Sequence, residues 1–282
     1  MSTDVEWEKW GVQDPYFSVL TDPKFRKGEI TAEAKQDFFV SGRVHVEHVL
    51  NACRKYIDPA FAPRRVLDFG CGVGRLVLPF AAMAREVVGV DISEAMLIEA
   101  RRNCMEQGVC NAEFVKSDDT LSAVEGLFDL VHTAIVLQHV DAQRGTRLVA
   151  HLLARLAPGG VGALQLTYGK AYHAATLGVP PTVEPPRPAP PMVAAVKSTP
   201  WLRKLFRRPP VSNQADTAQT SAAGATDGPV DDAPAKDPEM QMNPYNLNVL
   251  FYLMQTAGVT DFHTEFSDHG GELGVFLYFR KP

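Results

Sequence analysis

Short runs of apolar, β-branched residues alternate with segments of helical periodicity through the middle of this chain. Runs this apolar are typical of strands that are buried on both faces. Strand and helix in repeated alternation predict a parallel sheet with right-handed crossovers and helices on both faces. The expected strands are Arg65–Phe69, Glu86–Asp91, Ala112–Lys116, Phe128–Val136 and Val161–Thr167, and the expected helices are 75–84, 93–107 and 143–156.

The two ends of the chain show other patterns. After a predicted helix over 246–257, two further strands, 261–267 and 273–280, are separated by too few residues for a helical crossover. They must therefore pair antiparallel. The stretch 31–56 has helical periodicity and precedes the first strand, which favours a helical cap over a cleft.

One abrupt change of composition divides the chain. The segment 179–240 holds more than half of the 21 prolines, and its second half is small and polar. Such a segment buries too little apolar surface to offset the entropy of ordering it, so we expect a flexible insertion. The predicted organisation is an N-terminal helical cap (1–60), a core (61–178), the Pro-rich insertion (179–240), and a C-terminal helix and hairpin that complete the core (241–282).

Composition narrows the class of protein. With 282 residues, 45% hydrophobic residues and a net charge of −5, the chain fits a globular protein, and neither a membrane span nor a secretory signal is evident. Four cysteines without CxxC spacing favour reduced thiols in the cytoplasm, and no ligand cluster predicts a metal. The acidic balance argues against a nucleic-acid partner. The pattern predicts no particular oligomeric state.

The most informative segment is the run from Val66 to Arg75, VLDFGCGVGR. An apolar strand enters a glycine-rich turn, which brings bare backbone against a ligand. The nicotinamide fingerprint GxGxxG needs a glycine at position 75 or 77, where this chain has Arg75 and Val77. The chain therefore lacks the third, helix-packing glycine that a nicotinamide-dependent oxidoreductase would need.

At this point the sequence resembles the class I S-adenosylmethionine-dependent methyltransferases. Within that family it is most similar to bacterial methyltransferases that act on small-molecule or saccharide hydroxyls. Five motifs occur in the order of that family: DFGCGVG, VGVD ending at Asp91, KSDD ending at Asp119, FDLV from Phe128, and LAPGG ending at Gly160. The resemblance implies an α/β fold with a seven-stranded, mostly parallel sheet and an antiparallel C-terminal hairpin. It also implies S-adenosylmethionine as the cofactor.

Several residues match the cofactor-binding positions of that family. Asp91 ends the second strand and is suited to accept hydrogen bonds from both ribose hydroxyls. The resemblance implies that Asp118 binds the adenine amino group, with the backbone of Asp119 reaching a ring nitrogen, and that Asp68 steadies the methionine ammonium. It places Gly42 near the methionine carboxylate. The remaining expected cofactor residues are Gly70, Cys71, Gly72, Gly74, Ile92, Met96 and Val136.

A hydroxyl acceptor needs its proton removed during methyl transfer, and a neutral histidine can do this. His139 follows the fourth strand at the carboxyl edge of the sheet, where ligands bind in open α/β folds, so it is our candidate base. Many relatives carry a histidine here that only bonds backbone, so a structural role stays open. Candidate acceptor contacts are Arg75, which could instead pair with the methionine carboxylate or be solvated, and His45, Tyr168 and His173.

Inside the insertion, Trp201–Arg208 has apolar residues on one side and cations around them. This amphipathic, basic pattern suits a membrane surface or a partner protein, or is a solvated turn in a linker.

Together these features predict a cytoplasmic S-adenosylmethionine-dependent O-methyltransferase that acts on a saccharide or another small molecule. N- or C-methylation and a non-catalytic, cofactor-binding scaffold remain as alternatives, and a nicotinamide-dependent oxidoreductase is the least favoured.

Overall fold

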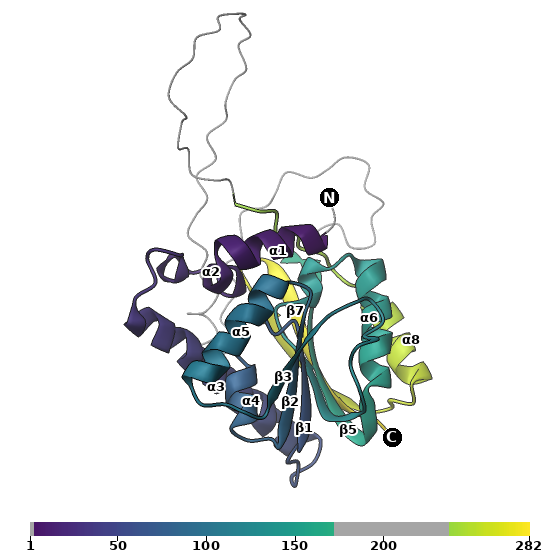
Figure 1. The fold of residues 1–282 in the computed structure, drawn as a ribbon. Coiled ribbons are helices and arrows are strands. Elements are labelled where there is room, and N and C mark those ends of the chain that lie inside the picture. Colours follow the sequence, from purple (N-terminus) through teal and green to yellow (C-terminus); the bar gives the residue numbers. More distant parts are fainter. Residues whose placement is uncertain (1–2, 172–236) are drawn as a thin grey trace, which may run out of the picture.

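A seven-stranded sheet with the strand order β3-β2-β1-β4-β5-β7-β6 runs through the protein (Figure 1). The computed structural model describes residues 3–171 and 237–282. The first five strands pair in parallel and the last two pair antiparallel, as predicted. The strands are β1 (Arg65–Phe69), β2 (Glu86–Asp91), β3 (Ala112–Lys116), β4 (Phe128–Thr133), β5 (Leu156–Lys170), β6 (Phe262–Asp268) and β7 (Glu272–Arg280).

Helices cover both faces of this sheet (Figure 1). On one face α3 (Ala32–Tyr56), α4 (Val77–Ala81) and α5 (Glu94–Glu106) enclose one apolar core. On the other face α6 (Ala142–Ala154) and α8 (Leu247–Thr256) enclose a second core. Apolar side chains of β1, β2 and β4 enter both cores, which explains why these strands read as nearly continuous apolar runs.

Side-chain caps determine where the long helices begin. The Thr31 hydroxyl accepts a hydrogen bond from the backbone N–H of Ala34, and the Ser93 hydroxyl accepts one from Met96. Asp141 caps α6 in the same way, through the N–H groups of Gln143 and Arg144. These residues satisfy N–H groups that a first helical turn leaves unpaired.

The elements around the glycine-rich turn differ from the prediction. Helix α4 begins at Val77 rather than Arg75, because Gly72 and Gly74 have φ angles of +51° and +84°, which an α-helix does not allow. Strand β4 ends at Thr133, three residues early, and β5 already begins at Leu156.

Two N-terminal helices that the sequence pattern did not predict lie across the top of the molecule in Figure 1. They are α1 (Thr3–Gln13) and α2 (Pro15–Val19). Residues 237–241, which we assigned largely to the insertion, run beside α1: the backbone N–H of Glu239 donates to the Glu6 carboxylate at 2.9 Å. Asp237 pairs with Arg26.

In the described ranges, 3–171 and 237–282, no helix combines the length and apolar character that a membrane crossing requires. All four cysteines are free thiols. The cytoplasmic location and the domain boundaries stay predictions. His173 and Trp201–Arg208 lie outside the described residues.

Gly42 of α3 offers a test of how the cap is packed. A Cβ at this position would lie 2.2 Å from the backbone carbonyl oxygen of Arg75. We expect Gly42→Ala to lower the free energy of unfolding by about 1–2 kcal/mol, because overpacking outweighs the gain in helix propensity. Urea denaturation measures this, with Arg43→Ala at an exposed site of the same helix as the control. A Gly42→Ala protein as stable as the wild type would contradict the packing described.

Candidate active site

The glycine-rich turn after β1 is fixed to the end of β2 by hydrogen bonds. The N–H groups of Gly70 and Cys71 both donate to the carbonyl of Val90, at 2.7 and 3.0 Å. Gly70 has a φ of +75°, and a Cβ there would lie 2.2 Å from a methyl carbon of Val136. The turn therefore needs a glycine at this position both for its conformation and for its close approach to the segment after β4.

Asp91 lies at the centre of this arrangement. Its carboxylate accepts hydrogen bonds from the backbone N–H of Gly72 at 2.8 Å and of Ser93 at 2.9 Å. Burial raises the pKa of Asp91 to about 6, since the enclosed site disfavours the charged form, and the backbone donors oppose this shift. A carboxylate has further acceptor capacity, which suits a ligand that offers hydroxyl groups.

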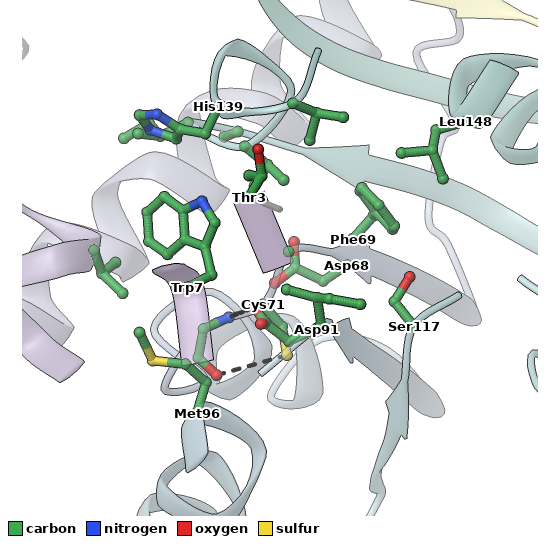
Figure 2. A pocket seen from close by; sticks show the side chains of 18 of the residues that line it. Thr3, Trp7, Asp68, Phe69, Cys71, Asp91, Met96, Ser117, His139 and Leu148 are labelled. Carbon is green, nitrogen blue, oxygen red and sulfur yellow. Dashed lines mark hydrogen bonds between the residues drawn. The ribbon is translucent and has the colours of Figure 1, made fainter. Parts of the chain in front are cut away.

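A covered cavity lies at the carboxyl ends of β1, β2 and β4, between the glycine turn and α1 (Figure 2). Eleven residues that the sequence singled out line it: Asp68, Gly70, Cys71, Gly72, Arg75, Asp91, Ile92, Met96, Asp119, Val136 and His139. Helix α1 contributes Thr3, Asp4 and Trp7 to the wall, and α2 contributes Ser18 and Val19.

Two buried polar atoms on the cavity residues have no hydrogen-bond partner among the residues that the structure describes. They are Oδ2 of Asp68 and Nε of Arg75. Asp68 is 1% exposed and Arg75 is 4% exposed, so neither atom is satisfied by bulk water. Burial lowers the pKa of Arg75 to about 10, which leaves the guanidinium charged at neutral pH. A ligand that carries both an ammonium and a carboxylate, as the methionine part of S-adenosylmethionine does, fits this pair.

Asp118 does not line the cavity, so its expected role in adenine binding does not match the structure. Its carboxylate instead accepts hydrogen bonds from its own turn, from the backbone N–H groups and the hydroxyls of Thr120 and Ser122. These bonds hold the pKa of Asp118 well below its usual range. Ser117 and Asp119, on either side of it, line the cavity instead.

Arg144 is a functional candidate that sequence reasoning missed. Its guanidinium donates to Asp119 at 2.6 Å and to both carboxylate oxygens of Asp4, so it joins α6 to α1 over the cavity. These ion pairs raise the pKa of Arg144 above its ordinary value.

The spacing of Trp7 and Trp10, three apart near the N-terminus, was a signal that an amphipathic helix precedes α3.

His139 lines the cavity and is 4% exposed. Its Nδ1 lies 2.7 Å from the carbonyl oxygen of Gln241, so Nδ1 carries a proton and Nε2 is the basic nitrogen. The side-chain amide of Gln138 lies 3.4 Å from Nε2, and the Trp7 ring lies 5.0 Å from the imidazole. Figure 2 shows His139 and Trp7 on the same side of the cavity.

Four other candidates lie away from the cavity wall. Gly42 packs beneath Arg75, and Gly74 packs against Ala100 of α5. Tyr168 packs against Phe266 of β6. His45 contacts His132 behind Asp68, so neither Tyr168 nor His45 is placed to touch an acceptor in this cavity.

Comparison with known families identifies the segment that holds this site. Residues 66–160 match the family model described as a methyltransferase domain. The chain carries an S-adenosylmethionine-dependent methyltransferase domain. The domain spans the glycine turn, Asp91 and His139, and the pair of Asp68 and Arg75 fits the cofactor as described above.

Solved structures show the same fold. Magnesium protoporphyrin IX methyltransferase from Synechocystis PCC 6803 with bound S-adenosylhomocysteine has a TM-score of 0.57 at 16% identity, and the match covers 100% of both chains. The structure of that enzyme with S-adenosylmethionine has a TM-score of 0.53, also at 16% identity, and the match covers 100% of this chain and 98% of the other. The predicted seven-stranded methyltransferase fold is thus confirmed.

Curated relatives correct one expectation. A 23S rRNA (uracil(1939)-C(5))-methyltransferase of Marinomonas sp. is 28% identical over 46% of this chain and 33% of its own length. The Burkholderia pseudomallei protein of the same name is 39% identical over 36% of this chain and 22% of its own length. The chain thus spans a third or less of these proteins. The exclusion of nucleic acid as a partner was wrong, because net charge summed over a chain does not define what a local site binds.

The raised pKa of Asp91 predicts how cofactor binding depends on pH. The hydroxyls of a bound ribose would donate to the ionised carboxylate of Asp91, and the ionised fraction falls as the pH drops below about 6. We expect the affinity for S-adenosylhomocysteine to fall about tenfold from pH 7.5 to pH 5, measured by calorimetry. Asp91→Asn should bind more weakly at pH 7.5 and lose most of this dependence. A flat wild-type profile, or an equal slope in Asp91→Asn, would refute the assignment of the ribose to Asp91.

Proposed function

We propose that the protein transfers the methyl group of S-adenosylmethionine to a hydroxyl group of a saccharide or another small molecule. The observation that carries this proposal is the hydrogen bond from His139 Nδ1 to the Gln241 carbonyl, which leaves Nε2 as a base at the cavity wall. A neutral imidazole held in this tautomer is suited to remove the proton of an alcohol.

The cofactor would supply an electrophilic methyl group on a sulfonium. Asp91 would hold the ribose hydroxyls, while Asp68 and Arg75 would hold the ammonium and carboxylate of the methionine part. Methyl transfer from a sulfonium is an in-line displacement, so the contribution of the protein is chiefly to orient the acceptor and exclude water. His139 adds the removal of one proton.

The cover of the cavity supports an acceptor that presents a small reactive group. Trp7 and Val19 close the N-terminal side, and Ile135 and Val136 close the side of β4.

Ile135 has a φ of +63°, which is rare for a β-branched residue, and its N–H donates to the Gln165 side chain at 2.6 Å. Backbone strain of this kind often occurs at functional sites.

Methylation of RNA is the second candidate function. It is favoured by the names of the curated relatives, which are RNA methyltransferases. The two candidates are separated by incubating the protein with labelled S-adenosylmethionine and a cell extract. Label in a small molecule through a base-stable methyl ether supports the first, and label in RNA supports the second. No label and no S-adenosylhomocysteine release would favour a scaffold.

His139→Gln tests the role of the base. We expect kcat to fall about 10²–10³-fold, because no side chain then accepts the proton, while the affinity for S-adenosylhomocysteine changes less than threefold. His151→Gln, on the helix α6 that follows His139, is the matched control and should keep normal turnover. Near-normal turnover of a folded His139→Gln protein would end the proposal that His139 is the base.

A further inference from the structure

Behind the cavity, the buried side chains of Asp68 and His132 and the partly buried side chain of His45 form a hydrogen-bonded line. Oδ1 of Asp68 on β1 lies 2.8 Å from Nδ1 of His132 on β4, and Nε2 of His132 lies 3.0 Å from Nε2 of His45 on α3. Of the three, only Asp68 reaches the cavity wall, and its second oxygen, Oδ2, has no hydrogen-bond partner in the described part of the chain. Figure 2 shows Asp68 beside the glycine turn, close to Asp91.

Aromatic side chains enclose the middle of this line. The ring of His132 lies 5.3 Å from that of Phe80 and 6.0 Å from that of Phe276, and the residue is 0% exposed. An apolar residue here would need no partners, whereas the histidine needs one at each nitrogen. Burying two imidazoles in such a setting costs free energy unless both are hydrogen-bonded. Both ring nitrogens of His132 are therefore hydrogen-bonded, one to Asp68 and the other to His45.

The surroundings of the line keep His45 in its neutral form. The Arg75 guanidinium already supplies a positive charge near Asp68 and His45. Burial, together with this positive charge, holds the pKa of His45 well below its ordinary value, so His45 is neutral. His132 Nδ1–H donates to the Asp68 carboxylate, and a single N–H joins the Nε2 atoms of His132 and His45. The negative charge of Asp68 thus remains available to the cavity.

We propose that His132 and His45 are positioning residues for the cofactor: they hold the Asp68 carboxylate with one oxygen bonded and the other turned toward the cavity, where it receives the ammonium of the methionine part. This inference rests on the proposed function, since it concerns the same cofactor site. Neither histidine touches the cofactor. Their effect reaches it only through Asp68, and only at the amino-acid end of the ligand.

Two ligands separate this role from general support of the fold. S-adenosylhomocysteine carries the ammonium and carboxylate, whereas 5′-methylthioadenosine has the same nucleoside and thioether without them. We expect His45→Leu to weaken S-adenosylhomocysteine binding about 5–20-fold by calorimetry and to change 5′-methylthioadenosine binding less than twofold. His45→Gln, whose side-chain amide can donate to or accept from Nε2 of His132, should retain most of the affinity. His132→Asn should also retain most of the affinity, because its amide nitrogen replaces Nδ1 as the donor to Asp68.

Two further variants complete the test. His48→Leu, one turn along α3 where the histidine pairs with Glu265 at 2.7 Å, is the matched control and should bind both ligands normally. Asp68→Asn should lose affinity for S-adenosylhomocysteine, and adding His45→Leu to it should cause little further loss, because both act on one interaction.

The outcomes have separate meanings. If the wild-type protein binds neither ligand, the proposed function fails and this inference fails with it. If the wild type binds both, and His45→Leu either weakens both equally or weakens neither, the inference alone is overturned. Selective loss of S-adenosylhomocysteine binding with rescue by His45→Gln supports it.

Discussion

The hydrogen bonds between the glycine-rich turn and the end of β2 are the constraint on which the rest of the site depends. Gly72 donates to Asp91 at 2.8 Å, and Gly70 and Cys71 donate to Val90, so the turn cannot move without moving both strand ends. The same bonds orient the Asp91 carboxylate. They also aim the end of β1, and with it Asp68, at the cavity. A side chain in place of Gly70 would collide with Val136, which would break this geometry at its source.

Around this fixed floor, the covering parts are held mainly by polar contacts. Arg144 joins α6 to Asp4 of α1 and to Asp119, and residues 237–241 bond both α1 and His139. The side chain of Arg144 is partly exposed, and exposed ion pairs contribute little to stability. The cover is therefore held less firmly than the apolar cores on the two faces of the sheet. A covered cavity of this kind needs a cover that can open, because cofactor and product must pass it.

Sequence reasoning predicted the sheet because buried strands and capped helices leave local signals. The helices form close to the predicted ranges 31–56 and 93–107, and the short connection between the last two strands required the antiparallel hairpin. The structure brings Asp68, Asp91 and His139 to one cavity, because the carboxyl ends of parallel strands meet at one edge of the sheet. Asp118 was misplaced because the hydrogen bonds of its turn depend on the rotamers of Thr120 and Ser122, which spacing does not reveal. Arg144 was missed as a residue of the cavity wall because its partners, Asp4 and Asp119, lie on elements distant in sequence.

The most direct test of the account is a crystal structure of the protein with S-adenosylhomocysteine. The account predicts that the ribose hydroxyls lie within hydrogen-bond distance of the Asp91 carboxylate and that the ammonium lies against Oδ2 of Asp68, under Trp7. A nucleoside bound away from Asp91, or an amino-acid part directed away from Asp68 and Arg75, would contradict it.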